Sequence, residues 1–304
     1  MNLQNCIDRL KNEIPNGDIF IDESMKKHTS FKLGGNAKLL VEPSNVETLE
    51  KVMMIVREMG INHYVIGNGS NLLVKDGGYN GVIIKIAQKM SAVVIDGDIV
   101  RSEAGVLLST LSKQIMASSL KNFEFASGIP GTLGGALYMN AGAYGSEMKN
   151  VVVEAKLIDE RGNIIVLNSE ELELTYRNSI IQSRHLIVLE VTMKLEKGDL
   201  DEIKEITKEL TFKRTSKQPL SLPSAGSTFK RPEGNYAGQL IDESGLRGFR
   251  HGGAMVSDLH CGFVVNIDNA TSREVLELID TVEKIVNDKH GVLLEAEVRV
   301  IGED

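Results

Sequence analysis

Two loops of small residues are the parts of this chain best suited to hold a phosphate group. The first reads VIGNGSN at residues 65–71, and the second reads ASGIPGTLGGALYMNAGAY at residues 126–144. Glycine lets backbone N–H groups approach a ligand closely and adopt positive φ angles. One such loop alone is consistent with a tight corner between elements, but two of them predict a clamp of amides around a diphosphate. The density of glycine also predicts neither regular helix nor strand for the second loop.

The residues after the first loop exclude a Rossmann dinucleotide site. That site needs a GxGxxG motif between a strand and a helix, whose N-terminus binds the pyrophosphate. Gly67 and Gly69 fit the first two positions, but Leu72 occupies the third, and residues 73–86 predict a turn and a strand. Any phosphate at this loop must therefore be held by loop amides and small side chains.

The composition is that of a globular protein of 304 residues, enough for two or three domains. The net charge is −8 and no run of Lys and Arg exceeds two residues, so we expect no nucleic-acid or membrane partner. A local basic group can still bind an anionic small molecule. The N-terminus has no apolar signal region, which predicts a cytoplasmic protein, and we expect a monomer. Cys6 and Cys261 have neither disulfide-framework nor metal-ligand spacing, so no metal site is expected.

A strand–helix–strand unit leads into the first glycine-rich loop. Strands are predicted at residues 37–41 and 63–66, and the apolar residues between them keep the spacing of a helix. Ser44 and Glu47 predict a capping box at the start of that helix. Gly60 predicts its end.

The middle of the chain has the pattern of an antiparallel sheet. Short β runs are separated by glycine turns, and one helix is predicted at residues 107–118. This pattern is typical of an α+β domain. The predicted strands are residues 92–95, 99–102, 151–158, 164–167 and 186–195.

The last third of the chain predicts a separate domain. The composition changes near residues 196–200, and a polar helix follows at residues 200–214. The clearest helix spans residues 271–289, with a capping box of Thr271 and Glu274. A final strand at residues 292–301 alternates apolar side chains with charged ones, namely Glu295, Glu297 and Arg299.

Taken together, these stretches resemble the UDP-N-acetylenolpyruvoylglucosamine reductases, the flavoproteins of bacterial peptidoglycan precursor synthesis. Each stretch is weakly specific alone, but the set runs in family order from about residue 28 to the C-terminus. The segment after YRNS is short, which is similar to the subclass lacking an inserted tyrosine-bearing loop. The matching stretches are HTSFKLGGNA, VIGNGSNLLVKDGGYNG, ASGIPGTLGGALYMNAGAYG, YRNS, PSAGSTFKRP, AGQLIDESGLRGFRHGGAMVS and LEAEVRVIG.

The resemblance implies an α+β fold: an FAD-binding fold of the vanillyl-alcohol-oxidase type, plus a C-terminal substrate-binding domain. We expect two FAD-binding subdomains. Residues 1–88 would form the first, completed by the C-terminal strand at residues 292–304, and residues 89–198 would form the second. Residues 199–291 would form the α+β substrate-binding domain.

The resemblance also implies a reaction. NADPH would reduce non-covalently bound FAD and leave, and the enolpyruvyl ether of a UDP-sugar would then take the hydride from N5 to give UDP-N-acetylmuramate. Negative charge then develops on the substrate carboxylate and must be stabilised, and the other carbon needs a proton. The family residues in these roles match Arg177, Ser227 as proton donor, and Glu297. A serine is a weak acid, so that role depends on the resemblance.

The resemblance assigns binding residues as well. The substrate would be bound by Tyr144, Lys217, Lys230, Gln239 and His260, whereas Arg231 has no assigned role. The expected FAD-binding residues come from both glycine-rich loops and their surroundings: Gly67, Asn68, Gly69, Ser70, Asn71, Leu72, Gly105, Gly128, Ile129, Gly131, Thr132, Gly135, Asn140, Ala141, Gly142, Ala143 and Ile187.

Two other classes of function remain open. A flavin-dependent oxidase of the same fold would need a base near N5 and often a His or Cys for covalent flavin attachment. Neither glycine-rich loop contains one. A non-catalytic nucleotide-binding module would give no common role to Arg177, Ser227 and Glu297. Without the family match, these three are more typical of a solvated charge, a turn hydroxyl and a solvated sheet face, respectively.

Overall fold

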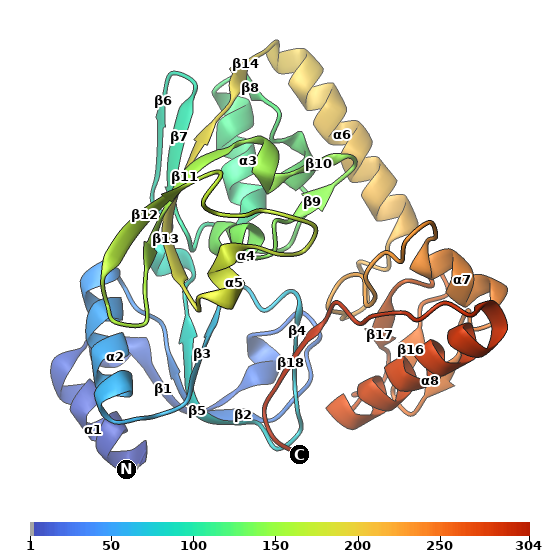
Figure 1. Cartoon of the computed structure of the whole chain (residues 1–304), viewed down its shortest axis with the longest axis horizontal. Coiled ribbons are helices and arrows are strands. Elements are labelled where there is room, and N and C mark those ends of the chain that lie inside the picture. Colours follow the sequence, from blue (N-terminus) through green and yellow to red (C-terminus); the bar gives the residue numbers. More distant parts are fainter. Residues whose placement is uncertain (1–2) are drawn as a thin grey trace. The chain divides into compact units, whose positions relative to one another are not determined.

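The computed structural model describes residues 3–304 (Figure 1). The chain divides into two compact units, each assembled from three separate stretches. Unit 1 contains the chain up to Phe20 together with Leu39–Asn68 and Gly81–Arg214. Unit 2 contains Ile21–Lys38, Gly69–Asn80 and Thr215–Asp304. The first glycine-rich loop therefore contributes residues to both units.

Unit 1 is built around an antiparallel sheet, as the sequence predicted. Its strand order is β12-β11-β13-β7-β6, and every neighbouring pair is antiparallel (Figure 1). A hairpin joins β11 to β12, where Gly162 has φ +85°. The strands are β6 (Val93–Asp96), β7 (Ile99–Glu103), β11 (Val152–Ile158), β12 (Ile164–Asn168) and β13 (Ile187–Lys194).

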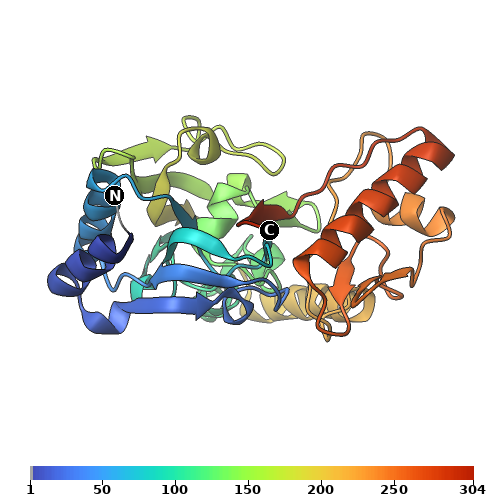
Figure 2. The same ribbon diagram turned by 90° about the horizontal axis from the view of Figure 1, so that it is seen from below.

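The predicted strand–helix–strand unit is also present, and most of it, from Leu39 to Ile66, belongs to unit 1. Helix α2 (Val46–Glu58) lies between strands β2 (Asn36–Val41) and β3 (His63–Ile66) in the chain, and α1 (Leu3–Glu13) packs against it (Figures 1 and 2). Strand β3 pairs in parallel with β5 (Tyr79–Lys85). These strands belong to a sheet of order β1-β2-β5-β3, in which β1 is Ile19–Ser24.

The predicted capping box of α2 was wrong. The N-cap is Asn45, whose side chain accepts a hydrogen bond of 2.8 Å from the Thr48 N–H. Asparagine is as good an N-cap as serine, and it stands one residue closer to the first helical turn. Glu47 instead pairs with Lys51 on the exposed side of the helix.

The second glycine-rich loop contains a helix that the sequence did not predict. Helix α4 (Leu133–Tyr138) begins at Thr132, whose side chain accepts from the Gly135 N–H. Leu133 and Leu137 are fully buried, and a Cβ on Gly134 would lie 2.9 Å from the Ala104 Cβ. Glycine costs about 1 kcal/mol in a helix, and here burial of two leucines and close packing offset that cost.

Unit 2 combines a small antiparallel sheet with two helices. The sheet has the order β15-β16-β17, and α8 (Ser272–His290) packs against it. The capping box of Thr271 and Glu274 is confirmed, and Gly291 ends α8 with φ +67°. Figure 2 shows α8 and the neighbouring α7 in unit 2. The remaining bounds are α7 (Ala237–Glu243), β15 (Arg250–His251), β16 (Ala254–Val256) and β17 (Val264–Asn266).

The last strand is shorter than predicted. Strand β18 covers only Arg299–Ile301 and pairs in parallel with β4 (Leu72–Val74). Residues 295–297 pair instead with residues 228–230, through an isolated bridge between Phe229 and Ala296. The change of partner interrupts the strand. The predicted alternation holds only in part. Val298 is buried and Glu295 and Arg299 are exposed, but Val300, predicted on the apolar face, is 43% exposed.

The other elements are short apart from two helices. Helix α3 is Leu108–Ala117, and α6 extends three residues beyond the prediction, as Leu200–Lys217. The short elements are η1 (Asn16–Asp18), η2 (Met25–Lys27), η3 (Gln88–Met90), β8 (Leu120–Lys121), η4 (Glu124–Ala126), β9 (Gly142–Ala143), β10 (Ser146–Glu147), η5 (Met148–Asn150), α5 (Ile180–Ser183) and β14 (Glu196–Lys197).

Within residues 3–304, no helix combines the length and the apolar character needed to span a membrane. The same residues contain no group of three or more His, Cys, Asp and Glu side chains arranged to hold a metal ion. Cys6 and Cys261 are both buried and free.

Candidate active site

The two glycine-rich loops contact each other in unit 1. The Asn68 side chain donates a 2.6 Å hydrogen bond from Nδ2 to the carbonyl of Pro130. A Cβ on Gly67 would lie 2.1 Å from the Thr132 Oγ1, closer than any side chain allows. Glycine is therefore required at position 67 because the second loop lies directly against it. This is the contact that a clamp formed from both loops requires.

The rest of the first loop is held by the segment that contains His28. Gly69 has φ +61°, and its carbonyl accepts from the Ser30 N–H at 3.2 Å. A Cβ on Gly69 would lie 2.1 Å from the carbonyl oxygen of His28. After Asn71 the chain enters strand β4 rather than a helix, which confirms the exclusion of a Rossmann site.

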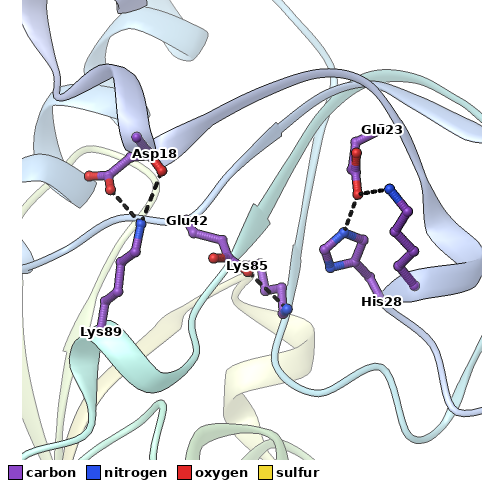
Figure 3. Close-up of polar contacts among 8 residues, drawn as sticks. Asp18, Glu23, His28, Glu42, Lys85 and Lys89 are labelled. Carbon is purple, nitrogen blue, oxygen red and sulfur yellow. Dashed lines mark hydrogen bonds and ion pairs between the residues drawn. The ribbon is translucent and has the colours of Figure 1, made fainter.

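The segment of His28, which contacts Gly69, is held by the Glu23 carboxylate in unit 2. Glu23 Oε1 lies 3.0 Å from His28 Nε2 and 3.3 Å from Lys27 Nζ (Figure 3). The hydrogen bond with His28 is the main cause that lowers the pKa of the Glu23 carboxyl. In unit 1, Figure 3 also shows the buried Asp18 paired with Lys89 at 2.6 Å.

A cation that the sequence reasoning missed lies against the second loop. A Cβ on Gly128 would lie 2.7 Å from the Cδ of Arg214, which is in the last turns of α6. Burial lowers the pKa of the Arg214 guanidinium, and the Tyr144 hydroxyl acts in the opposite direction. A partly desolvated cation is stabilised by a nearby anion. No motif marks Arg214, because only the direction of α6 brings it to the loop.

These observations fit an FAD diphosphate. The glycines at 67 and 128, both in unit 1, leave no room for a Cβ, and the loops that contain them consist mostly of small residues. Such a surface presents backbone donors to phosphate. Arg214 adds a positive charge beside Gly128.

The other predicted FAD-binding residues belong to the second loop, to elements of unit 1, or to the end of the first loop and β4. Gly105 follows β7, and a Cβ there would lie 2.0 Å from the carbonyl oxygen of Ala87. Ile187 begins β13 and is buried. Ile129 packs against the core of unit 1, as does Ala141. Gly142 and Ala143 form β9.

In the first loop, Ser70 is half-buried, and Leu72, which begins β4, is buried. In the second loop, the Gly131 carbonyl accepts a hydrogen bond from the Leu108 N–H.

Arg177 lies at the tip of a tight turn. The Thr175 and Asn178 backbones exchange two hydrogen bonds of 3.1 Å, which leaves Tyr176 and Arg177 as the two turn residues. Arg177 has φ +55°, a conformation that costs a non-glycine residue about 1 kcal/mol or more. Its guanidinium lies over the Tyr176 ring, 5.0 Å from the centroid. Strain of this kind collects at functional sites.

The Arg177 turn is joined to the second glycine-rich loop. The Asn140 Nδ2 donates to the Thr175 carbonyl at 3.1 Å, and Asn140 itself is fully buried with φ +43°. The Ser179 hydroxyl donates to the Tyr138 carbonyl at 2.8 Å. The Gln182 side chain donates to the carbonyls of Tyr138 and Arg177. Asn140 was predicted to bind FAD, and the structure shows its side chain positioning the Arg177 turn.

Ser227 and Glu297 lie on adjacent segments of unit 2. The Glu297 N–H donates to the carbonyl of Thr228 at 2.7 Å, so Glu297 pairs with the residue that follows Ser227. The Ser227 side chain is exposed and precedes the buried Thr228, while Glu297 is half-buried. The structure therefore places the backbone of Glu297 next to the residue that follows Ser227. Arg177 belongs to unit 1.

The predicted substrate-binding residues have defined partners. Lys230 forms an ion pair with Glu295. Gln239 donates to Glu243 at 2.8 Å along α7, and Lys217 is the last residue of α6. Tyr144 is 46% exposed with φ +55°. Arg231, which had no assigned role, lies over the ring of Tyr236 at 4.1 Å.

His260 has a defined tautomer. Its Nδ1 accepts a 3.0 Å hydrogen bond from the Gly262 N–H, so the neutral ring carries its proton on Nε2. Burial is the main cause that lowers the His260 pKa, with the Arg247 charge in addition. The imidazole packs edge-on against Phe263, with the ring centroids 5.1 Å apart. A neutral donor is therefore available at this position near pH 7.

Known proteins match the chain over almost its whole length. A family model described as FAD binding domain matches residues 37–168, and one described as UDP-N-acetylenolpyruvoylglucosamine reductase, C-terminal domain, matches residues 218–301. The UDP-N-acetylenolpyruvoylglucosamine reductase of Alkaliphilus oremlandii is 55% identical, covering 96% of each chain. That of Clostridioides difficile is 49% identical, covering 100% of each.

This chain belongs to the UDP-N-acetylenolpyruvoylglucosamine reductase family. The resemblance inferred from the sequence is thereby confirmed, and the chain is an oxidoreductase. Members of the family use FAD and NADPH, and the FAD binding domain lies within residues 37–168 of this chain.

Solved structures support the fold assignment. The UDP-N-acetylenolpyruvylglucosamine reductase of Thermus caldophilus has a TM-score of 0.80 at 34% identity, covering 93% of this chain and 97% of that one. Phl p 4.0202, a glucose dehydrogenase, has a TM-score of 0.52 at 18% identity over 64% of this chain and 44% of that chain, which shows a shared fold alone. The α+β fold of the vanillyl-alcohol-oxidase type with a reductase C-terminal domain is thus confirmed.

Proposed function

We propose that this chain reduces the enolpyruvyl ether of UDP-N-acetylglucosamine-enolpyruvate to UDP-N-acetylmuramate with NADPH, in the cytoplasm and as a monomer. FAD, held by the two glycine-rich loops, would supply hydride transfer from NADPH to the enolpyruvyl carbon through N5. The substrate gains that hydride on one carbon and a proton on the next, a two-electron reduction. The observation that carries the proposal is the pairing of Glu297 with the residue after Ser227, within a full-length family match.

Arg177 stabilises the negative charge that develops on the substrate carboxylate. A guanidinium presents several donors in a fixed plane, which suits a carboxylate. The Arg177 turn is held by Asn140, Ser179 and Gln182, so its backbone is fixed before substrate binds. A preorganised donor of this kind stabilises a transition state without reorganisation.

Ser227 donates the proton, and Glu297 tunes that step. The Ser227 side chain is exposed on a segment whose next residue is fully enclosed: Thr228 is 1% exposed and hydrogen-bonded through its N–H and hydroxyl. The backbone next to the Ser227 hydroxyl is therefore held in place, while the hydroxyl itself is accessible to a ligand. The Glu297 carboxyl group on the adjacent segment can pass a proton to the Ser227 hydroxyl and makes the surroundings of that hydroxyl more polar.

The remaining residues bind the ligands. The predicted FAD-binding residues hold the cofactor without a covalent bond, through backbone donors of the two glycine-rich loops. The UDP-sugar is bound by Tyr144, Lys217, Lys230, Gln239 and His260.

We propose the domain division expected from the sequence: residues 1–88 and 89–198 for FAD, and residues 199–291 for the substrate. Residues 292–304 complete the first part, and the pairing of β18 with β4 supports that completion. We propose no nucleic-acid or membrane partner.

The visible spectrum of the purified protein tests the proposal. Flavin absorbance should bleach when NADPH is added without oxygen and return when the enolpyruvyl UDP-sugar is added. Reduction by an alcohol and reoxidation by oxygen would instead support an oxidase of the same fold. A protein that binds nucleotide but never changes colour with NADPH would be a binding module.

A further inference from the structure

Asn71, the last residue of the first glycine-rich loop, contacts the segment of Glu297 twice. Its side-chain Nδ2 donates to the Glu297 carbonyl at 3.1 Å. Its own carbonyl accepts from the Arg299 N–H at 3.0 Å. One residue thus holds the chain on both sides of Val298, all within unit 2.

The peptide groups of Glu297 are fixed from two directions. The Glu297 N–H donates to Thr228, next to Ser227, at 2.7 Å, while its carbonyl accepts from Asn71. Residues 295–298 lie outside regular strands, so no continuous ladder holds them in place. Their position depends on individual hydrogen bonds, which include one of 2.8 Å from the Lys230 N–H to the Glu295 carbonyl, and on the burial of Val298.

We propose that Asn71 is a positioning residue for Glu297, which links the FAD-binding loop to the proton-transfer step. This inference rests on the proposed role of Glu297. A carboxamide holds a carbonyl in a defined direction, whereas a flexible glycine-rich loop alone would not. The angle of the Glu297 side chain is set by its backbone, and small misplacements of a catalytic group slow a reaction strongly.

The same loop provides a matched comparison. Asn68 also donates its side-chain amide to a carbonyl, but the acceptor is Pro130 of the second glycine-rich loop. Asn68 thus joins the two halves of the FAD clamp, whereas Asn71 joins the clamp to Glu297. Aspartate at either position keeps the size of the side chain and removes the N–H donor.

The experiment compares Asn71→Asp with Asn68→Asp in the FAD-loaded enzyme by stopped flow. Both variants are saturated with FAD, and each is scored by its reoxidation rate relative to its own rate of flavin reduction by NADPH. For Asn71→Asp, this ratio with enolpyruvyl UDP-sugar as oxidant should fall about tenfold, as for the loss of one hydrogen bond. Asn68→Asp should weaken FAD binding, yet reoxidise normally once saturated with FAD. Asn71→Ala, which adds no charge, should behave like Asn71→Asp.

A double mutant separates positioning from general destabilisation. If Asn71 acts through Glu297, Asn71→Asp should cause no further loss of reoxidation rate in a Glu297→Gln background. Equal losses in both backgrounds would overturn the inference. A normal reoxidation rate in Glu297→Gln alone would overturn the role of Glu297 and, with it, this inference.

Amide hydrogen exchange provides a readout that does not depend on activity. In FAD-free protein, Asn71→Asp should increase the exchange rate of residues 297–299 by about tenfold, whereas Asn68→Asp should leave it unchanged. Unchanged exchange in Asn71→Asp would show that the contact does not hold this segment, and would overturn the inference whatever the kinetics.

Discussion

Glu297 donates its backbone N–H to the carbonyl of Thr228 at 2.7 Å, so two segments far apart in sequence lie side by side in unit 2. Ser227 precedes Thr228, with its side chain exposed, and the Glu297 side chain is half-buried. A hydroxyl and a carboxylate on adjacent segments suit the proton transfer to substrate in the reaction proposed above. Substitutions at Ser227 and Glu297 should therefore slow that half and leave flavin reduction intact.

Ser227→Ala should separate the two half-reactions. Flavin reduction by NADPH needs no proton donor and should stay near normal, whereas reoxidation by the enolpyruvyl UDP-sugar should slow by orders of magnitude, about 10²-fold or more. Stopped-flow measurement of the flavin absorbance gives both rates. An equal fall in both would mean that the substitution acts on folding or flavin placement.

Glu297→Gln should cost about 3 kcal/mol or more in the substrate half-reaction, because it removes a charge at the site. The control is Glu295→Gln, two residues away on the same face. Glu295 is exposed and pairs with Lys230, and such a pair contributes at most about 1 kcal/mol. The limiting rate of reoxidation should therefore change little in Glu295→Gln, although loss of the pair can alter the KM. Equal limiting rates for the two variants would contradict a catalytic role for Glu297.

Gly67→Ala should give a folded protein depleted of FAD. The new Cβ would lie 2.1 Å from the Thr132 Oγ1, so the two glycine-rich loops must separate. The control is Gly17→Ala, where a Cβ has nothing within 4 Å and the glycine does not have a positive φ. The ratio of flavin to protein absorbance after purification measures the effect. A Gly67→Ala protein with full flavin content would rule out this contact as part of the clamp.

Gly131 tests the same clamp from the second loop. Replacing it with a bulky residue such as leucine should also give soluble protein with little FAD, since the side chain would occupy the space of the diphosphate. Far-ultraviolet circular dichroism should confirm that the fold is retained. Full yellow colour in this variant would exclude the second loop from the FAD site.

The Glu23 carboxyl should make stability depend on pH. Hydrogen bonds from His28 and Lys27 lower its pKa below the ordinary 4.5. Because the folded pKa is the lower one, Glu23 stabilises the folded state above pH 4.5, and this is lost as the pH falls through the folded value. Glu23→Gln should therefore reduce stability by about 1 kcal/mol at pH 7, and the difference from the unchanged protein should shrink progressively as the pH falls below 4.5. Thermal melts at a series of pH values measure this. Glu47→Gln, at a 76% exposed side chain, should show a much smaller difference.

Local patterns in the sequence determined most of the elements. The antiparallel strands of unit 1, the capping box of α8 and the exclusion of a Rossmann site followed from spacing and from single residues such as Leu72. These features depend on neighbours within a few positions, so the sequence is sufficient to predict them. The family resemblance placed Ser227 and Glu297 in one reaction, although their spacing gives no reason to pair them.

The tertiary structure decided which residues meet. Helix α4 forms although it contains two glycines, because Leu133 and Leu137 are buried. Local helix propensity does not include the contribution of burial. Arg214 reaches Gly128 only because α6 runs in that direction, and no motif marks it. Asn71, predicted to bind FAD, also donates its side-chain amide to the Glu297 carbonyl, because strand β18 pairs with β4 directly after the loop. Contacts between distant segments arise when the whole chain packs, so local patterns in the sequence do not predict them.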